Sequence, residues 1–467
     1  MSAKITPFTI SIPDSRLTRL HQKLSLADFP SDEETTIPNT IETPNSNEPE
    51  RWSRGAPVSE IKRLTAYWKT EFNWRAVEAR LNTELPQFTT DVEIDGFGGY
   101  TVHFVHRRGG GEEAGGSSTT SSNSAIPLLF LHGWPGSFLE VGRILPLLVD
   151  GDGDGDGDGQ SFHVVAPSLI DFGFSGASRG KAFGLDQHAE AYHKLMLALG
   201  YSEYIIQSGD LGYLISRRIS ALYGPNIKAI HTNSALPAPP TALSHPELLA
   251  APLSEFDAAG LARTTALSKT SMGYFALLTT KPATIAHCLA DSPVGLLAWI
   301  CEKLHDWGDD SIATTNTNTT TTTTGSSSSS TTSKHGGWSD EDVVTWVCVH
   351  YFSTAGPGAP GNLYYALGGH SEHGEHGEHG EATGPGAGGG AFELVQRYVD
   401  GVPLGISRFA GDVVVLPGAW NATLGPVVVQ SEYAFGGHFG AWECPREVVG
   451  DVRKLVREVG VEIGRGE

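Results

Sequence analysis

The segment around Asp210 constrains the fold of this chain of 467 residues more than any other feature. The apolar run Tyr204-Ile-Ile206 is typical of a buried β-strand, and a helix-like pattern follows until Gly224-Pro225, with apolar residues at Leu214, Ile215, Ile219 and Leu222. Between strand and helix lies Ser208-Gly-Asp210-Leu-Gly212. Small residues two positions before and after the aspartate allow a sharp turn, and a helix N-terminus favours a negative charge. The pattern therefore predicts that Asp210 projects, ionised, from a strand-to-helix turn.

This turn resembles the nucleophile elbow of α/β-hydrolases, usually written G-x-S-x-G, although a carboxylate stands here in place of the serine. The alternative is a turn aspartate that only caps its own helix. A literal G-x-S-x-G also occurs at Gly176-Ala-Ser178-Arg-Gly180. No apolar strand leads into that segment, so we interpret it as a chance match.

The rest of the chain predicts an α/β fold with a mainly parallel sheet. Short apolar or alternating segments at 100–106, 126–131 and 162–166 are typical of strands, and 188–199 is typical of a helix. Residues 235–370 are mostly helical in pattern, and strand character returns at 402–406 and 426–433 before a helical tail. The first hundred residues suggest short helices separated by loops, with Ser59 and Asn73 as N-caps. A helical segment thus interrupts the α/β part.

Two further segments could complete a site around Asp210. The first is the turn His132-Gly-Trp134-Pro-Gly-Ser137, which follows the strand 126–131. The backbone N–H groups of Trp134 and Leu211 could form an oxyanion hole there. The alternative is an ordinary strand-to-loop turn.

The second segment is the loop Phe435-Gly-Gly-His438-Phe439, which could bring an imidazole to the elbow. Asp412, just past a strand, could orient that histidine, and the chain order Asp210, Asp412, His438 is the order of the α/β-hydrolases. Three other acids fit this position less well, because Asp400 precedes the strand, Glu432 lies within one and Glu443 follows the histidine.

Composition excludes several classes of protein. The 32 basic and 53 acidic residues give a net charge of −21, which disfavours binding to nucleic acid or to an anionic membrane. No apolar run is long enough to span a bilayer, so we expect a soluble, cytoplasmic protein without a membrane anchor. Four isolated cysteines, Cys288, Cys301, Cys348 and Cys444, are expected to be structural thiols.

Four low-complexity tracts, at 109–124, 150–159, 314–333 and 369–390, are interpreted as insertions. The Asp/Gly repeat at 150–159 resembles a calcium loop but lacks the glutamate that an EF-hand requires at its twelfth position. Histidines recur every three residues at His370, His373, His376 and His379, where a solvated insertion is favoured over a metal site. We therefore expect no metal and no cofactor.

Together these segments resemble the epoxide hydrolases of the microsomal type. The residues that carry the resemblance are Pro13-Asp14, Trp52, Tyr67-Trp68, Trp74-Arg75, Leu85-Pro-Gln-Phe88, His132-Gly-Trp-Pro135, Gly273-Tyr-Phe-Ala-Leu-Leu-Thr-Thr-Lys-Pro282, Asp291-Ser-Pro-Val-Gly295 and Gly436-Gly-His-Phe439. The resemblance implies an α/β-hydrolase fold with an N-terminal helical meander (1–95), a core in two parts (96–235 and 396–467) and a helical cap (236–395).

The resemblance also implies roles for the candidate residues. Asp210 would attack an epoxide carbon, and His438, oriented by Asp412, would activate the water that hydrolyses the resulting ester. Tyr274 and Tyr364, on the cap, would donate protons to the epoxide oxygen. The implied partners are a small apolar epoxide and water, and a homodimer is possible.

One departure concerns the elbow, which in this family usually reads Gly-Gly-Asp-Trp-Gly, whereas Leu211 stands here in place of the tryptophan. A haloalkane dehalogenase, which also uses an elbow aspartate, and a catalytically inactive ligand-binding member of the fold are the alternatives.

Overall fold

The computed structural model describes residues 4–31, 52–110, 125–151, 159–179, 183–309, 337–369 and 390–461. The histidine repeat at 370–379, the Thr/Ser tract at 314–333 and most of the Asp/Gly tract lie outside these residues.

A single mixed sheet forms the centre of the described structure, with the strand order β1-β2-β3-β5-β4-β6-β7-β8-β9. Pairing is antiparallel from β1 to β5 and parallel from β5 to β9. The strands are β1 (Thr6–Phe8), β2 (Gln87–Ile94), β3 (Gly98–Arg107), β4 (Ile126–Leu131), β5 (Phe162–Pro167), β6 (Tyr204–Ser208), β7 (Ile227–Thr232), β8 (Leu404–Gly411) and β9 (Val427–Gly437). The expected mainly parallel sheet is confirmed.

The register of the central strands brings the candidate segments to one edge of the sheet. All residues of β4 and β6 are buried, as their continuous apolar sequence predicts. Leu131 pairs with Ser208, and Ser208 pairs with Thr232. The turns that begin at His132 and Gly209 therefore leave the sheet side by side.

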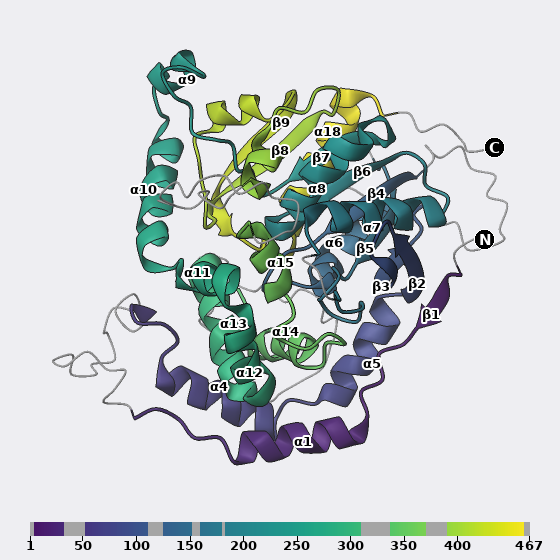
Figure 1. Cartoon of the computed structure of the whole chain (residues 1–467), viewed down its shortest axis with the longest axis vertical. Coiled ribbons are helices and arrows are strands. Elements are labelled where there is room, and N and C mark those ends of the chain that lie inside the picture. Colours follow the sequence, from purple (N-terminus) through teal and green to yellow (C-terminus); the bar gives the residue numbers. More distant parts are fainter. Residues whose placement is uncertain are drawn as a thin grey trace, which may run out of the picture.

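Helices cover both faces of this sheet (Figure 1). They are α6 (Val141–Asp150), α7 (Leu185–Ala198), α8 (Asp210–Tyr223), α17 (Gly440–Glu443) and α18 (Pro445–Val459), with 3₁₀ turns η1 (Phe138–Glu140), η2 (Gly224–Asn226) and η3 (Gly418–Thr423). The buried apolar face of α18, which includes Val448, Val452 and Leu455, contacts β7, β8 and β9. Burial of such a stripe is what fixes a helix on a sheet.

A helical layer lies between β7 and β8 in the sequence. It comprises α9 (Pro246–Ala250), α10 (Glu255–Thr270), α11 (Gly273–Thr280), α12 (Pro282–Asp291), α13 (Pro293–Trp307), α14 (Asp340–Tyr351), α15 (Gly361–Leu367) and α16 (Ala391–Gln396). The N-terminal helices α1 (Asp14–Ser25), α4 (Val58–Thr70) and α5 (Trp74–Glu84) wrap this layer along the lower side of Figure 1, where α1 and α4 contact α13.

The structure corrects the sequence-based view of the N-terminal segment. Residues 1–95 were expected to be helical between loops, yet β1 and β2 lie there and extend the main sheet. β7 was also missed. Asn73 caps α5 as expected, through a bond from the Ala76 N–H to its side chain, whereas α4 begins at Val58 after Pro57, so Ser59 is not its N-cap.

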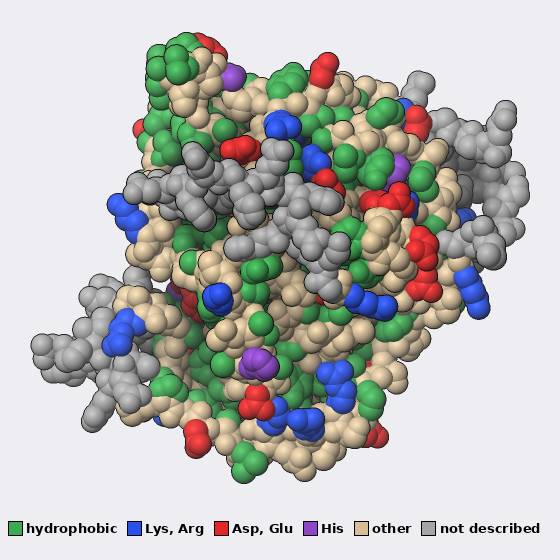
Figure 2. Space-filling model, viewed as in Figure 1, with side chains coloured by type: hydrophobic (Ala, Val, Ile, Leu, Met, Phe, Trp, Pro, Cys, Tyr) green, Lys and Arg blue, Asp and Glu red, His purple; other side chains and the backbone are tan. Residues whose placement is uncertain are grey.

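The surface has an apolar corner at α9. Figure 2 shows hydrophobic side chains gathered there, and Leu243, Leu249 and Leu253 are exposed. Within the described ranges, no single helix is long and apolar enough to cross a bilayer, and α12 with α13 passes that test only as a pair bent by 116°.

Candidate active site

Asp210 is the first residue of α8 and lies at the tip of a tight turn after β6. Its φ of 50° is in the left-handed region, which is uncommon for a residue other than glycine. A Cβ at Gly212 would lie 2.2 Å from the carbonyl oxygen of Leu131 at the end of β4. The glycine after the aspartate is therefore required for α8 to approach the neighbouring strand.

Three residues from separate elements meet at this turn. Nε2 of His438 lies 3.3 Å from Oδ2 of Asp210, and its Nδ1 lies 2.8 Å from Oδ1 of Asp412. Asp412 directly follows β8, and His438 directly follows β9, which continues to Gly437 instead of ending near Tyr433. The structure thus brings together Asp210, Asp412 and His438 as the sequence predicts.

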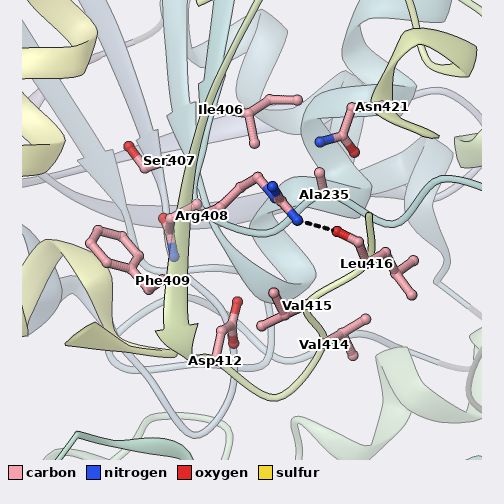
Figure 3. Close-up of a pocket in the computed structure, with 11 residues that line it drawn as sticks. Ala235, Ile406, Ser407, Arg408, Phe409, Asp412, Val414, Val415, Leu416 and Asn421 are labelled. Carbon is pink, nitrogen blue, oxygen red and sulfur yellow. Dashed lines mark hydrogen bonds between the residues drawn. The ribbon is translucent and has the colours of Figure 1, made fainter. Parts of the chain in front are cut away.

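Asp412 is held from its own loop and from the cap. The Val413 N–H donates to Oδ1 of Asp412 (2.6 Å), and the Arg263 guanidinium on α10 donates to the Asp412 carbonyl (2.8 Å). Beside it is a small cavity of about 20 Å³, shown in Figure 3, across which Arg408 donates to the carbonyl of Leu416 (2.5 Å). The loop that carries the acid is therefore fixed on two sides.

The environment of His438 favours its charged form. Burial alone would lower the pKa of the imidazole, but the carboxylates of Asp412 and Asp210 outweigh burial and raise this pKa well above 6.5. Trp307 packs edge-on against the ring, with centroids 5.1 Å apart, and its backbone carbonyl accepts a hydrogen bond from the backbone N–H of His438 (2.8 Å). The two carboxylates on either side of His438 thus favour its imidazolium form.

The turn after β4 donates a hydrogen bond to the elbow. The Trp134 N–H lies 2.8 Å from Oδ1 of Asp210. A Cβ at Gly133 would lie 2.3 Å from the same oxygen, so glycine is required there. Leu211, the other expected donor, directly follows Asp210 and is buried. Among the described residues, no hydrogen bond joins the Leu211 N–H to the Asp210 carboxylate, so its role stays a prediction.

Two side chains of α14 hold the same turn from the other side. Trp346 donates its indole N–H to the carbonyl of Pro135 (2.7 Å), and Nε2 of His350 lies 2.6 Å from that oxygen. Burial lowers the pKa of His350 to about 4, so its ring is neutral and can still donate one N–H. The turn is therefore oriented by a helix that follows it by about two hundred positions.

Glu140, a residue that the sequence analysis missed, also faces this site. Burial and the charge of Asp210 raise its pKa to about 8, while the charge of His438 and backbone N–H groups of Gly133 and Ser137 oppose the rise. Its carboxyl fills the space where a Cβ at Gly136 would stand. Spacing alone gave no signal for it, because Glu140 reads as an ordinary first-turn acid of the next helix.

The two candidate tyrosines lie over the elbow from the cap. Tyr274 is the second residue of α11 and Tyr364 lies on α15, and their ring centroids are 6.1 Å apart. Burial, then the charge of Asp210, raises the pKa of each phenol above its usual value of 10. Both are therefore neutral donors. Tyr365, the adjacent alternative, is exposed.

The other candidates lie elsewhere. Ser178 lies in a loop, where its hydroxyl and N–H both bond to Asp171, and Gly180 is outside the described residues. Glu432 pairs with Arg408, while Glu443 accepts the N–H of Gly437. Neither replaces Asp412 beside His438.

The described residues contain no group of three or more His, Cys, Asp or Glu side chains that could hold a metal ion. Their four cysteines are free thiols, three of them buried.

Comparison with known proteins identifies the family. Residues 5–141 match the family described as "Epoxide hydrolase N terminus", and residues 126–289 match "alpha/beta hydrolase fold". A Stigmatella aurantiaca protein with the name "Putative epoxide hydrolase" is 30% identical over 97% of this chain and 85% of its own length. Epoxide hydrolase 1 of Sus scrofa is 29% identical over 97% of this chain and 88% of its own.

Solved structures agree. Aspergillus niger epoxide hydrolase superposes with a TM-score of 0.71 at 29% identity, over 98% of this chain and 97% of its own. The juvenile hormone epoxide hydrolase of Bombyx mori, at 22% identity, shares the fold with a TM-score of 0.74 over 98% of this chain and 95% of its own. The expected α/β-hydrolase fold is confirmed, and this chain belongs to the epoxide hydrolases of the α/β-hydrolase superfamily.

Proposed function

We propose that this enzyme converts an epoxide to a vicinal diol through a covalent ester on Asp210. The observation that carries the proposal is the position of the Asp210 carboxylate. One oxygen accepts the Trp134 N–H, while the other faces an imidazole that is itself paired with Asp412. A carboxylate forms an ester with an epoxide carbon, and an ester can afterwards be hydrolysed, whereas a serine would form a stable ether.

In the first step, an oxygen of Asp210 attacks an epoxide carbon as the carbon–oxygen bond of the ring breaks. The epoxide oxygen takes a proton from Tyr274 or Tyr364, which lie over the elbow and carry their protons at neutral pH. The epoxide carbon is now bonded to Asp210, and the alkoxide has become a hydroxyl group.

Esterification prepares the second step. Asp210 loses its negative charge, so one of the two carboxylates that raise the pKa of His438 disappears. The imidazolium then gives up its proton more readily, and a proton returns through solvent to the tyrosinate that the first step left. The neutral imidazole can then accept a proton from water. Asp412 keeps the ring oriented and stabilises the charge that returns to it.

In the second step, activated water attacks the carbonyl carbon of the ester. The developing oxyanion is the oxygen that accepts the Trp134 N–H, and Leu211 would supply a second donor. The bond between the acyl carbon and the diol oxygen then breaks, and the diol leaves with a proton from His438. Asp210 finally passes its carboxyl proton to the imidazole, which restores the carboxylate and the starting state of the site.

Single-turnover hydrolysis of styrene oxide in ¹⁸O-labelled water tests this order of events. We expect the first diol to be unlabelled and the label to appear in Asp210, because water oxygen enters the carboxylate and not the diol. Label in the first diol, with none in Asp210, would mean direct attack by water and would overturn the ester route.

A further inference from the structure

Lys303 is a buried cation next to the cap tyrosine. It lies on α13 with its side chain 5% exposed. Its ammonium lies 4.7 Å from the ring centroid of Tyr274, 5.4 Å from that of Trp307 and 5.9 Å from that of Trp299. A buried ammonium is costly unless it is compensated, so this position needs a reason.

The ion pair of Lys303 does not by itself explain that position. Glu302, the neighbouring residue on α13, is the anionic partner and is more exposed than the lysine. An ion pair formed at the surface would satisfy both groups without placing a cation against aromatic rings. The three rings instead surround the ammonium with the negative faces of their π-systems.

Tyr274 connects this cation to the elbow. Its ring also stacks on that of Trp134, with centroids 5.2 Å apart and planes 13° from parallel. The backbone N–H of Trp134 holds Asp210. A charge on Lys303 therefore acts on a ring that contacts the turn above the nucleophile.

Burial and nearby carboxylates oppose loss of the Tyr274 proton. Burial is the largest cause of its raised pKa, the charges of Asp210 and Glu302 add to it, and a hydrogen bond with Tyr364 acts in the opposite direction. A phenol that donates to an alkoxide gains electron density in its ring as the proton moves. Among the charged groups facing Tyr274, Lys303 has the sign that favours this change.

We propose that Lys303 accelerates opening of the epoxide ring by stabilising the negative charge that Tyr274 acquires as it donates its proton. The inference rests on the role of Tyr274 in the proposed function. A cation is attracted more strongly to the electron-rich ring of a partial phenolate than to the ring of a neutral phenol. The contact between Lys303 and Tyr274 therefore strengthens in the transition state and lowers the barrier to opening of the epoxide ring. Lys303 is a positioning residue, because it acts through Tyr274 and not on the epoxide.

The experiment measures the two chemical steps separately in Lys303→Met, which removes the charge but keeps an unbranched side chain. We expect the single-turnover rate of Asp210 alkylation by styrene oxide to fall about tenfold or more. Hydrolysis of the ester should keep its rate, because Tyr274 takes no part in that step. Lys303→Arg, which retains a cation, should recover most of the alkylation rate.

A double-mutant cycle with Tyr274→Phe identifies the route of the effect. If Lys303 acts through the phenol, Lys303→Met should have no further effect on alkylation in the Tyr274→Phe background. Lys62→Met, which removes an exposed lysine of α4 near the ring of Phe29, serves as the matched control and should leave both steps unchanged.

The outcomes separate the two proposals. A slow Tyr274→Phe with a normal Lys303→Met would overturn the role of Lys303 alone. A normal Tyr274→Phe would overturn the role of that tyrosine, and the inference with it. Equal loss of alkylation and hydrolysis in Lys303→Met, without rescue by arginine, would show a packing effect and also reject the inference.

Discussion

The rings of Trp134 and Tyr274 stack face to face, so the turn that bonds to the proposed nucleophile, Asp210, directly contacts the cap residue that would protonate the epoxide. This contact fixes the height of the phenol above Asp210. Attack and protonation occur on opposite ends of one carbon–oxygen bond, and both groups must be in place together. The predictions below test the parts of this arrangement one at a time.

Asp210→Ala should reduce turnover by a factor of about 10⁴ or more while the protein stays folded. The carboxylate is the proposed nucleophile, and its removal leaves no group that can form the ester. Steady-state diol formation and thermal unfolding, measured on the same sample, check both parts. Substantial activity in a folded variant would remove Asp210 from the mechanism.

His438→Gln should stop the reaction after the first step. Glutamine cannot accept the proton of the attacking water, so the ester should accumulate, and intact-protein mass spectrometry should show an increase equal to the mass of one epoxide. Asp210→Ala in the same background is the matched control and should show no added mass. If His438→Gln showed no added mass and released diol at the normal rate, the proposed role of the imidazole would be wrong.

Tyr274→Phe and Tyr364→Phe should each slow alkylation, and the double variant should lose roughly 10²- to 10⁴-fold, the range of general-acid catalysis. Each phenol can compensate in part for the other because both lie over the elbow. Tyr365→Phe, which changes an exposed neighbour of Tyr364, is the control. A silent double variant would show that the protons come from elsewhere.

Gly212→Ala should destabilise the fold by about 1–3 kcal/mol, because the added methyl group would overlap the Leu131 carbonyl. Urea unfolding measures this loss. Gly450→Ala on α18 is the control. A Cβ there meets open space, and helix propensity predicts no loss of stability. Equal effects of the two changes would contradict the close approach of α8 to β4.

Glu443→Gln should change how stability depends on pH. Burial raises the pKa of Glu443 to about 8, with the charge of Asp309 adding to it. Between about pH 4.5 and 8 the folded protein therefore binds a proton that the unfolded chain has lost, so this group makes stability fall as pH rises. Glutamine does not titrate, so the variant lacks this loss of stability. The difference between its melting temperature and that of the parent should therefore shift in favour of the variant as the pH rises from 5 to 8.

The control for this pH experiment is Glu458→Gln, which changes an exposed acid on the neighbouring helix α18. Its melting temperature should follow that of the parent at every pH. A Glu443→Gln curve parallel to the parent curve would mean that Glu443 is ionised in the folded protein throughout.

The sequence predicted those parts of the molecule whose signals are local. The elbow at Asp210 needs small residues at fixed positions, and the clash expected at Gly212 shows why. The side chain of Asn73 caps α5 because it can accept an N–H of the first turn. The positions of Asp412 and His438 followed from strand ends in a parallel sheet, a rule of topology that needs no contact information.

Other parts depend on contacts that the sequence does not display. β2 is a half-buried strand that pairs with β1 and β3 at the antiparallel end of the sheet, and it directly follows the helices of the N-terminal segment. From the sequence alone, Glu140 and Lys303 look like exposed charged residues of their helices. Their burial depends on which segments pack against them. Their surroundings come from segments distant in sequence.

The bonds from α14 to Pro135 have a consequence for engineering. Trp346 and His350 belong to the helical layer, yet both contact the carbonyl of Pro135, next to Trp134, whose N–H is the proposed donor of the oxyanion hole. In a chimaera that takes its helical layer from a relative, the helix equivalent to α14 would be replaced too, and the contacts with the Pro135 carbonyl would change. Substrate specificity and catalytic rate would then change together. A chimaera that keeps the rate would therefore need a helix that makes the same two contacts.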